Sequence, residues 1–163
     1  MSAFNFDSVT LPTGITQFRG EIREFLRREL PDQPAEKKAN SWAVSDAAFS
    51  RKLGAQGWIG MCWPKRYGGL ERSSIERYVV LEELLAAGAP VGAHWIADRQ
   101  SGPALLKFGN ELQCNRYLPG MARGEIYCCI GMSEPNAGSD LAAVRTRAEK
   151  LEDGRWRDRK SVV

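Results

Sequence analysis

Apolar residues recur at helical spacing from the first part of the chain onward. Between residues 15 and 30 they return every third or fourth position, with arginine and glutamate between them, which predicts an amphipathic helix that ends at Pro31. Residues 32–45 are polar and favour a surface connection. After this connection, Phe49 and Leu53 stand about one helical turn apart and predict a short helix.

A loop rich in glycine and tryptophan precedes the next long helix. Residues 58–70 contain glycines and a proline that exclude a long regular element, and large aromatic side chains that favour a packed loop. Ser73 and Glu76 have the spacing of a capping box, so a helix is predicted over residues 74–87. Glu82 falls near the apolar side of that helix and needs a partner if it is buried.

Two further helices are predicted before residue 120. The first covers residues 91–100, and Pro103 then restarts or kinks the chain. The second covers residues 111–118 and is expected to stop at Pro119 and Gly120. Helices joined by such short connections are typical of a helical bundle.

The C-terminal part of the chain has the pattern of β-structure. Residues 126–130 favour a strand, and residues 144–148 alternate with a period of two. Asp153 and Gly154 predict a hairpin turn, after which Trp156 begins the returning strand.

These patterns predict a mainly α protein with two parts. A helical domain, residues 1–124, precedes the incomplete start of a β-domain, residues 125–163. Two or three strands are too few to be stable alone, because they need further strands or a helix to cover them. We therefore expect the chain to be a truncated part of a larger fold.

Composition and charge argue against several classes of function. The 163 residues contain 23 Lys and Arg against 20 Asp and Glu, interleaved along the chain, which gives a net charge of +3. No basic face for nucleic acid is indicated. No stretch approaches the ~18 apolar residues of a membrane span, and the first ten residues do not have the pattern of a secretory signal.

Cysteine and histidine usage favours a cytoplasmic protein without a metal centre. The four cysteines form no CxxC pair, and the adjacent pair Cys128 and Cys129 cannot easily bridge to itself. Reduced thiols in a cytoplasm fit this usage best. His94 is the single histidine, and we expect it to be a surface or hydrogen-bonded residue, not an acid or base.

The segment with the most chemical information is IGMSEPNAGSD, residues 130–140. It joins the end of a predicted strand to a loop in which Gly138, Ser139 and Asp140 follow one another. Glycine permits a positive φ and a close backbone approach, so successive N–H groups and the serine hydroxyl can point at an anion. Turns of this composition are also common without a ligand, and both interpretations stay open.

SEPNAGSD closely resembles the flavin signature of the acyl-CoA dehydrogenase family, in its bacterial type. WPKRYGGL, residues 63–70, is similar to a Trp-Pro and Gly-Gly segment of that family, and the run over residues 109–124 is similar to the approach to its flavin strand. The resemblance covers roughly residues 15–154 in the family's order.

The resemblance implies a fold, a reaction and a cofactor. The family has a helical N-terminal domain, a central β-barrel domain and a C-terminal four-helix domain, of which this chain would supply the first and begin the second. Its members dehydrogenate an acyl-CoA thioester between the α and β carbons with FAD as hydride acceptor, and pass the electrons to an electron-transfer flavoprotein. They form dimers and tetramers. Residues 155–163 stop before the segment that covers the flavin, so most cofactor contacts are expected elsewhere.

Carried over residue by residue, the resemblance implies a cofactor-binding strand end and loop. Ile130, Met132 and Ser133 would lie beside the flavin, where backbone groups and the serine hydroxyl reach the pyrimidine edge. Gly138 would give the backbone room to approach, and Ser139 would contact the cofactor or the CoA moiety near the pyrophosphates. Ser133 could instead be a strand-end serine that satisfies a turn.

The resemblance also implies a substrate contact but no catalytic residue. Trp95 and Arg99 would line the far end of the acyl pocket and suit a short or bulky acyl group, although a core tryptophan and a surface arginine are equally expected. The family's catalytic base comes from the C-terminal domain. Glu134, in a turn before Pro135, is therefore assigned no catalytic role.

Several hypotheses follow from this resemblance. The first is a truncated FAD-dependent acyl-CoA dehydrogenase that is inactive as this chain alone. The second is a non-catalytic interaction module that pairs with a full-length subunit. The third is an incomplete gene product without a separate role. An acyl-CoA oxidase, which returns electrons to oxygen, ranks below the dehydrogenase.

Overall fold

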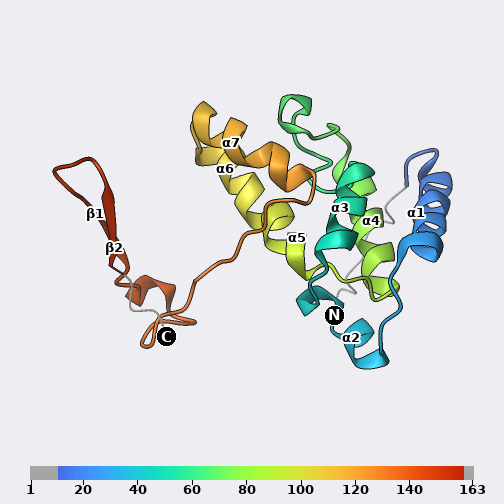
Figure 1. The fold of residues 1–163 in the computed structure, drawn as a ribbon, viewed down its shortest axis with the longest axis horizontal. Coiled ribbons are helices and arrows are strands. Elements are labelled where there is room, and N and C mark those ends of the chain that lie inside the picture. Colours follow the sequence, from blue (N-terminus) through green and yellow to red (C-terminus); the bar gives the residue numbers. More distant parts are fainter. Residues whose placement is uncertain (1–10, 160–163) are drawn as a thin grey trace, which may run out of the picture. The chain divides into compact units, whose positions relative to one another are not determined.

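The computed structural model describes residues 11–159, which fall into two compact units (Figure 1). The first unit extends to Cys128, and the second begins at Cys129. The first is helical and the second contains a β-hairpin, so the mainly α fold class predicted above is confirmed. No helix within residues 11–159 has both the length and the apolar composition that crossing a bilayer requires.

The helices of the first unit follow one another with short connections. In chain order they are α1 (Ile15–Glu29), α2 (Ala35–Ala39), η1 (Ser41–Ala43), α3 (Ala47–Ala55), η2 (Lys65–Tyr67), α4 (Ser74–Ala86), α5 (Gly92–Ile96), η3 (Ala97–Ser101), α6 (Gly102–Phe108) and α7 (Glu111–Ala122). The predicted surface connection over residues 32–45 thus carries two short helices, and α2 has no buried residue.

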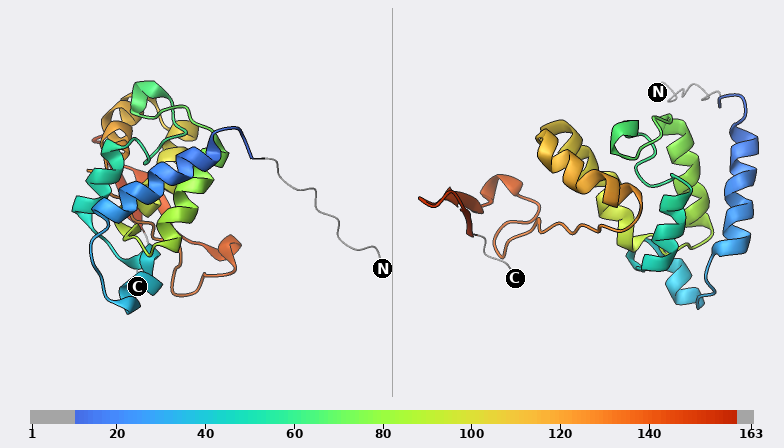
Figure 2. Two further views of the ribbon diagram at one scale, coloured as in Figure 1. Left: turned by 90° about the vertical axis from the view of Figure 1, so that its right-hand side faces the viewer. Right: turned by 45° about the horizontal axis from the view of Figure 1, so that its top comes forward.

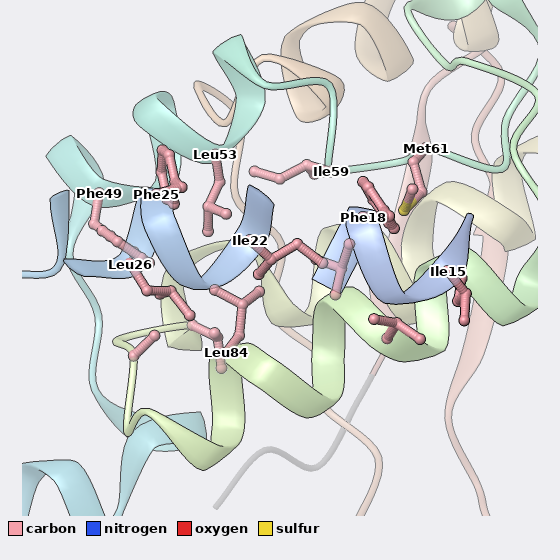
Figure 3. Close-up of a cluster of buried hydrophobic side chains, with 14 residues drawn as sticks. Ile15, Phe18, Ile22, Phe25, Leu26, Phe49, Leu53, Ile59, Met61 and Leu84 are labelled. Atoms are coloured by element: carbon pink, nitrogen blue, oxygen red, sulfur yellow. The ribbon is translucent and has the colours of Figure 1, made fainter. Parts of the chain in front are cut away.

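Helix α1 packs along α4, as both views of Figure 2 show. Its apolar stripe is buried, and Ile22 has no exposed surface. Figure 3 shows Ile22 and Leu26 on the side of α1 that faces Leu84 of α4. The Phe25 ring lies 6.1 Å from that of Phe49 in α3, so three helices share one core. The amphipathic pattern of α1 is therefore explained by burial of one face.

The capping box at the start of α4 is confirmed, but the buried glutamate of this helix is Glu83. Its carboxylate accepts hydrogen bonds from Arg23 at 2.7 and 3.0 Å and from Arg19, both on α1. Glu82 is only half-buried and pairs with Arg19. Helical periodicity cannot separate two adjacent positions at the edge of a stripe, so the expectation for Glu82 applies to Glu83.

Replacing Glu83 with glutamine is expected to lower the free energy of unfolding by about 2 kcal/mol at pH 7, since the amide cannot neutralise two arginines. The loss is smaller than for a fully buried pair because the Arg23 side chain is 60% exposed. The Arg23 guanidinium holds the pKa of Glu83 below its usual 4.5. This stabilisation is therefore present above pH 4.5 and lost as the pH falls through the folded-state pKa.

Glu24→Gln is the matched control, because its pair with Arg27 is exposed on both sides. It should cost no more than about 0.5 kcal/mol. Urea unfolding of both variants checks the prediction, and equal small losses would contradict it.

Helices α5, η3 and α6 follow one another directly, with no residue between them, and η3 is a π-helical turn. The predicted helix over residues 91–100 corresponds to α5 and most of η3. Pro103 stands in the first turn of α6, where its missing N–H is tolerated. The chain therefore does not restart at Pro103, and the irregularity in the helix is the π-helical turn that precedes the proline.

Helix α7 extends past Pro119 to Ala122, so the predicted stop was wrong. The proline removes one hydrogen bond near the end of the helix. The last turn is nevertheless held by burial of Leu118 and Met121 in a second apolar cluster, which forms around Trp63. Tertiary packing here outweighs the local cost of the proline.

The segment over residues 126–130 is not a strand, contrary to the sequence prediction. Its first part instead packs on the helices, where Ile126 contacts the second cluster and its N–H donates to the Gly120 carbonyl. Within residues 11–159 the paired strands are β1 (Arg147–Lys150) and β2 (Trp156–Arg159). A strand requires a ladder partner, and this segment has none among those residues.

The predicted hairpin is confirmed in the second unit. Strands β1 and β2 pair antiparallel, with Lys150 opposite Trp156 and Arg147 opposite Arg159. Gly154 has a φ of 81° in the turn, a conformation that favours glycine. A short helical turn, η4 (Leu141–Ala143), precedes the hairpin.

Candidate functional site

A tight turn forms the loop of residues 133–140, called the 133–140 loop here. The N–H of Glu134 donates to the Ala137 carbonyl at 2.8 Å, and the N–H of Ala137 donates back to the Glu134 carbonyl at 3.1 Å. Ala137 is buried, whereas Ser133 and Ser139 are exposed. The loop therefore turns its apolar residue inward and presents its serines outward.

Glu134 is buried and its carboxylate holds the loop from inside. Oε2 accepts the N–H of Arg145 at 2.9 Å, and Oε1 accepts both the N–H of Thr146, at 2.8 Å, and the Thr146 hydroxyl. These donors stand immediately before β1. Sequence reasoning gave Glu134 no catalytic role, but it did not identify this anchoring role either.

The five predicted cofactor-binding residues share one exposed stretch of the second unit. Ile130 is 42% and Met132 63% exposed, which is high for apolar side chains. The hydroxyls of Ser133 and Ser139 bond to no other residue in the part of the chain that the structure describes. Both hydroxyls are free to meet a ligand.

Gly138 differs from the expectation in its backbone conformation. Its φ does not lie in the left-handed region, so the positive φ that glycine permits is not used here. A Cβ built at this position would meet nothing within 4 Å. The open space leaves the backbone accessible to close approach, which is the other property expected of this glycine.

The hollow beside the loop is too small to enclose a dinucleotide. It measures about 130 Å³ and is lined by Glu134, Pro135, Asn136, Ala143 and Arg145. Pockets that enclose a drug-sized ligand span roughly 300 to 1,000 Å³. A cofactor held by Ser133 and Ser139 would therefore lie on the outer surface of this loop.

The predicted substrate residues stack on one another in the first unit. The Arg99 guanidinium carbon lies 4.6 Å from the centroid of the Trp95 ring, a cation–π contact. Trp95 is half-buried against the core that α1, α3 and α4 share, and Arg99 is exposed. The guanidinium therefore covers one face of the indole, and the pair is bulky and positively charged.

Asp98, next to Arg99, is a buried carboxylate that the sequence analysis missed. It accepts the N–H of Gly60 at 2.7 Å and a hydrogen bond from Arg77 of α4 at 2.8 Å. It thereby ties η3 to α4 and to the loop of residues 58–70. An aspartate one position before an exposed arginine carries no signal of such burial in the sequence.

His94 is buried and hydrogen-bonded, as one of the two expectations had it. Its Nδ1 lies 2.8 Å from the Ser50 hydroxyl of α3. Burial lowers the pKa of His94 to about 4, although the Asp98 charge acts in the opposite direction. The imidazole is neutral at pH 7 and holds helices together.

Comparisons with known proteins agree with this architecture. The family model described as acyl-CoA dehydrogenase, N-terminal domain, matches residues 14–125. The chain is 35% identical over 133 residues to the acyl-CoA dehydrogenase FadE29 of Mycobacterium tuberculosis, which covers 81% of this chain and 34% of that protein. The chain thus spans about a third of the length of this relative.

Solved structures resemble the chain at a similar level. The Tcur3481-Tcur3483 steroid ACAD has a TM-score of 0.75 and 36% identity, covering 88% of this chain and 38% of that one. The ChsE4-ChsE5 complex from Mycobacterium tuberculosis has a TM-score of 0.74 and 29% identity, covering 90% and 37%. The chain therefore belongs to the acyl-CoA dehydrogenase family, with the family's helical N-terminal domain followed by the start of its β-domain.

Proposed function

We propose that the chain is part of an FAD-dependent acyl-CoA dehydrogenase. The observation that carries this proposal is the 133–140 loop in a chain of this family. Within the described residues, the hydroxyls of Ser133 and Ser139 have no hydrogen-bond partner, and the space beside the Gly138 backbone is unoccupied. When bound, FAD supplies the hydride acceptor, and the chain supplies binding and orientation. We propose an electron-transfer flavoprotein as the redox partner.

The residues present fit the cofactor. Ser133, with the backbone at Ile130 and Met132, would hold the pyrimidine edge of the flavin, and the exposed apolar side chains would cover part of the ring system. Ser139 and the open backbone at Gly138 would hold a phosphate-bearing part of the cofactor or of CoA. We assign Glu134 no role as a base, because it is buried and its two oxygens accept the N–H groups of Arg145 and Thr146.

The Trp95 and Arg99 pair suits a bulky acyl group. If this pair lines the far end of the acyl pocket, its bulk and charge suit a short or bulky acyl group better than a long flexible chain. One solved relative is a steroid ACAD, and a fused-ring acyl group is bulky in this sense. We propose a ring-containing or otherwise bulky acyl-CoA as the substrate class.

Retention of FAD by the 163-residue chain tests the function. Because most cofactor contacts are expected outside these residues, we expect weak but saturable FAD binding, measured by fluorescence titration. The double variant Ser133→Ala and Ser139→Ala should bind at least tenfold more weakly, since each lost hydrogen bond costs about 1 kcal/mol. Ser74→Ala, an exposed serine on α4, is the control. Absence of saturable binding, or a double variant that binds like the wild type, would contradict the proposal.

A second candidate is an interaction module that pairs with a full-length subunit. One solved relative is a complex of two differently named chains, ChsE4 and ChsE5. Phe108 and Leu112, near the turn between α6 and α7, are 78% and 77% exposed and are available for such a contact. Co-elution with a full-length homologue in size-exclusion chromatography, lost in Phe108→Ser, would favour this function.

A further inference from the structure

The carboxylate of Glu134 is buried, whereas the serines of the 133–140 loop are exposed. Glu134 and Ala137 are the buried residues of the loop, and the residues on either side of each are exposed. Two backbone hydrogen bonds between Glu134 and Ala137 close the turn. Because Glu134 forms one side of the turn, a change in the position of Glu134 would move the turn with it. That position is set by residues 11 and 12 places further along the chain, Arg145 and Thr146.

We propose that Glu134 is a positioning residue for the cofactor. It joins the 133–140 loop to the start of the hairpin and so holds Ser133 and Ser139 in their outward arrangement before a cofactor binds. This inference rests on the proposed function, because it assigns the serines to the cofactor. Glu134 touches neither cofactor nor substrate in this role.

An ionised carboxylate is the side chain that suits these donors. It accepts on both oxygens and donates on neither, and hydrogen bonds to a charged acceptor are about twice as strong as neutral ones. A glutamine in its place has one acceptor oxygen, and its NH₂ group would face an N–H donor of Arg145 or Thr146. The two N–H groups would repel each other, and one of the hydrogen bonds that hold the loop would be lost.

The consequence for binding is a loss of preorganisation. A loop that samples several conformations must be ordered when the ligand binds, which weakens affinity without removing any ligand contact. The anchor also couples the loop to β1, since Thr146 leads directly into that strand. Cofactor affinity should therefore depend on the Thr146 hydroxyl as well, to a smaller extent.

The test compares Glu134→Gln with Glu152→Gln in the full 163-residue chain. Glu152 is an exposed glutamate in the hairpin loop and serves as the matched control. Amide hydrogen exchange at Arg145 and Thr146, measured without FAD, reports the anchor. Quenching of FAD fluorescence reports the dissociation constant, and thermal unfolding reports the helical unit.

In Glu134→Gln we expect at least tenfold faster exchange at both amides and at least tenfold weaker FAD affinity, with unchanged stoichiometry at saturation and unchanged unfolding of the helical unit. Thr146→Val should weaken affinity by a smaller factor. Unchanged exchange would overturn the inference, and so would faster exchange with unchanged affinity, which would leave Glu134 a purely structural residue.

Failure of the proposed function gives a different result. A wild-type chain that binds no FAD contradicts that function, and the positioning of a cofactor falls with it. The exchange rates of Arg145 and Thr146 then still show whether the carboxylate holds the loop. Protected amides in the wild type that lose protection in Glu134→Gln would support the anchor by itself.

Discussion

Replacing Gly54 with alanine is expected to lower the free energy of unfolding of the helical unit by about 3 kcal/mol or more. A Cβ at Gly54 of α3 would lie 2.3 Å from the carbonyl carbon and oxygen of Arg123, just after α7. These are backbone atoms, so no side-chain rotation can relieve the overlap. Either α3 or the end of α7 must move, and both carry buried residues.

Gly20→Ala is the matched control, because it makes the same change in the middle of α1. A Cβ at Gly20 would meet nothing within 4 Å, and its φ is not left-handed. Alanine is favoured over glycine inside a helix by roughly 0.5 to 1 kcal/mol, so this variant should be more stable than the wild type. Urea unfolding of the two variants should thus give effects of opposite sign. A Gly54→Ala protein as stable as the wild type would contradict the close approach of these segments.

The helical unit is expected to lose stability between pH 6.5 and pH 4 through His94. The pKa of this buried imidazole is lowered from 6.5 to about 4, chiefly by burial. In that range the unfolded chain binds a proton that the folded chain does not, so stability is complete above pH 6.5 and falls as the pH falls. The gap between the two pKa values corresponds to roughly 3 kcal/mol at full effect.

Urea unfolding from pH 7 to pH 4 measures this loss, with His94→Gln as the reference. The amide is polar but does not titrate in this range. His94 is the single histidine of the chain, so the difference between the two pH profiles isolates one imidazole from the carboxylates. Parallel profiles for the two proteins would show that His94 is protonated without cost and would contradict its burial beside Ser50.

Local signals predicted those parts of the fold whose partners lie close in sequence. The capping box at Ser73 and Glu76 lies within one helical turn, and the hairpin turn at Gly154 is made by adjacent residues. The apolar stripe of α1 repeats often enough to specify one buried face. Each of these features depends on residues within a few positions of one another, so the local sequence is enough to predict it.

In the candidate site, too, only the features that depend on residues close in sequence could be predicted. The position of the 133–140 loop was recognisable from its motif, and the stacking of Arg99 on Trp95 follows from their one-turn spacing. The anchors of the site were not recognisable. Glu134 and Asp98 are buried carboxylates whose donors come from other elements, and a carboxylate in a sequence carries no mark of the groups that will surround it.

The sequence by itself determined the long helices α1 and α4, the hairpin and the location of the loop, because these depend on spacing and turn chemistry over a few residues. Tertiary structure alone decided that α7 continues past Pro119, that residues 126–130 form no strand, and that Glu83 is the buried glutamate of α4. In each case the deciding energy is a contact with a distant segment: burial in a cluster, a missing ladder partner, or two arginines on another helix. Such contacts exist only once the chain has folded.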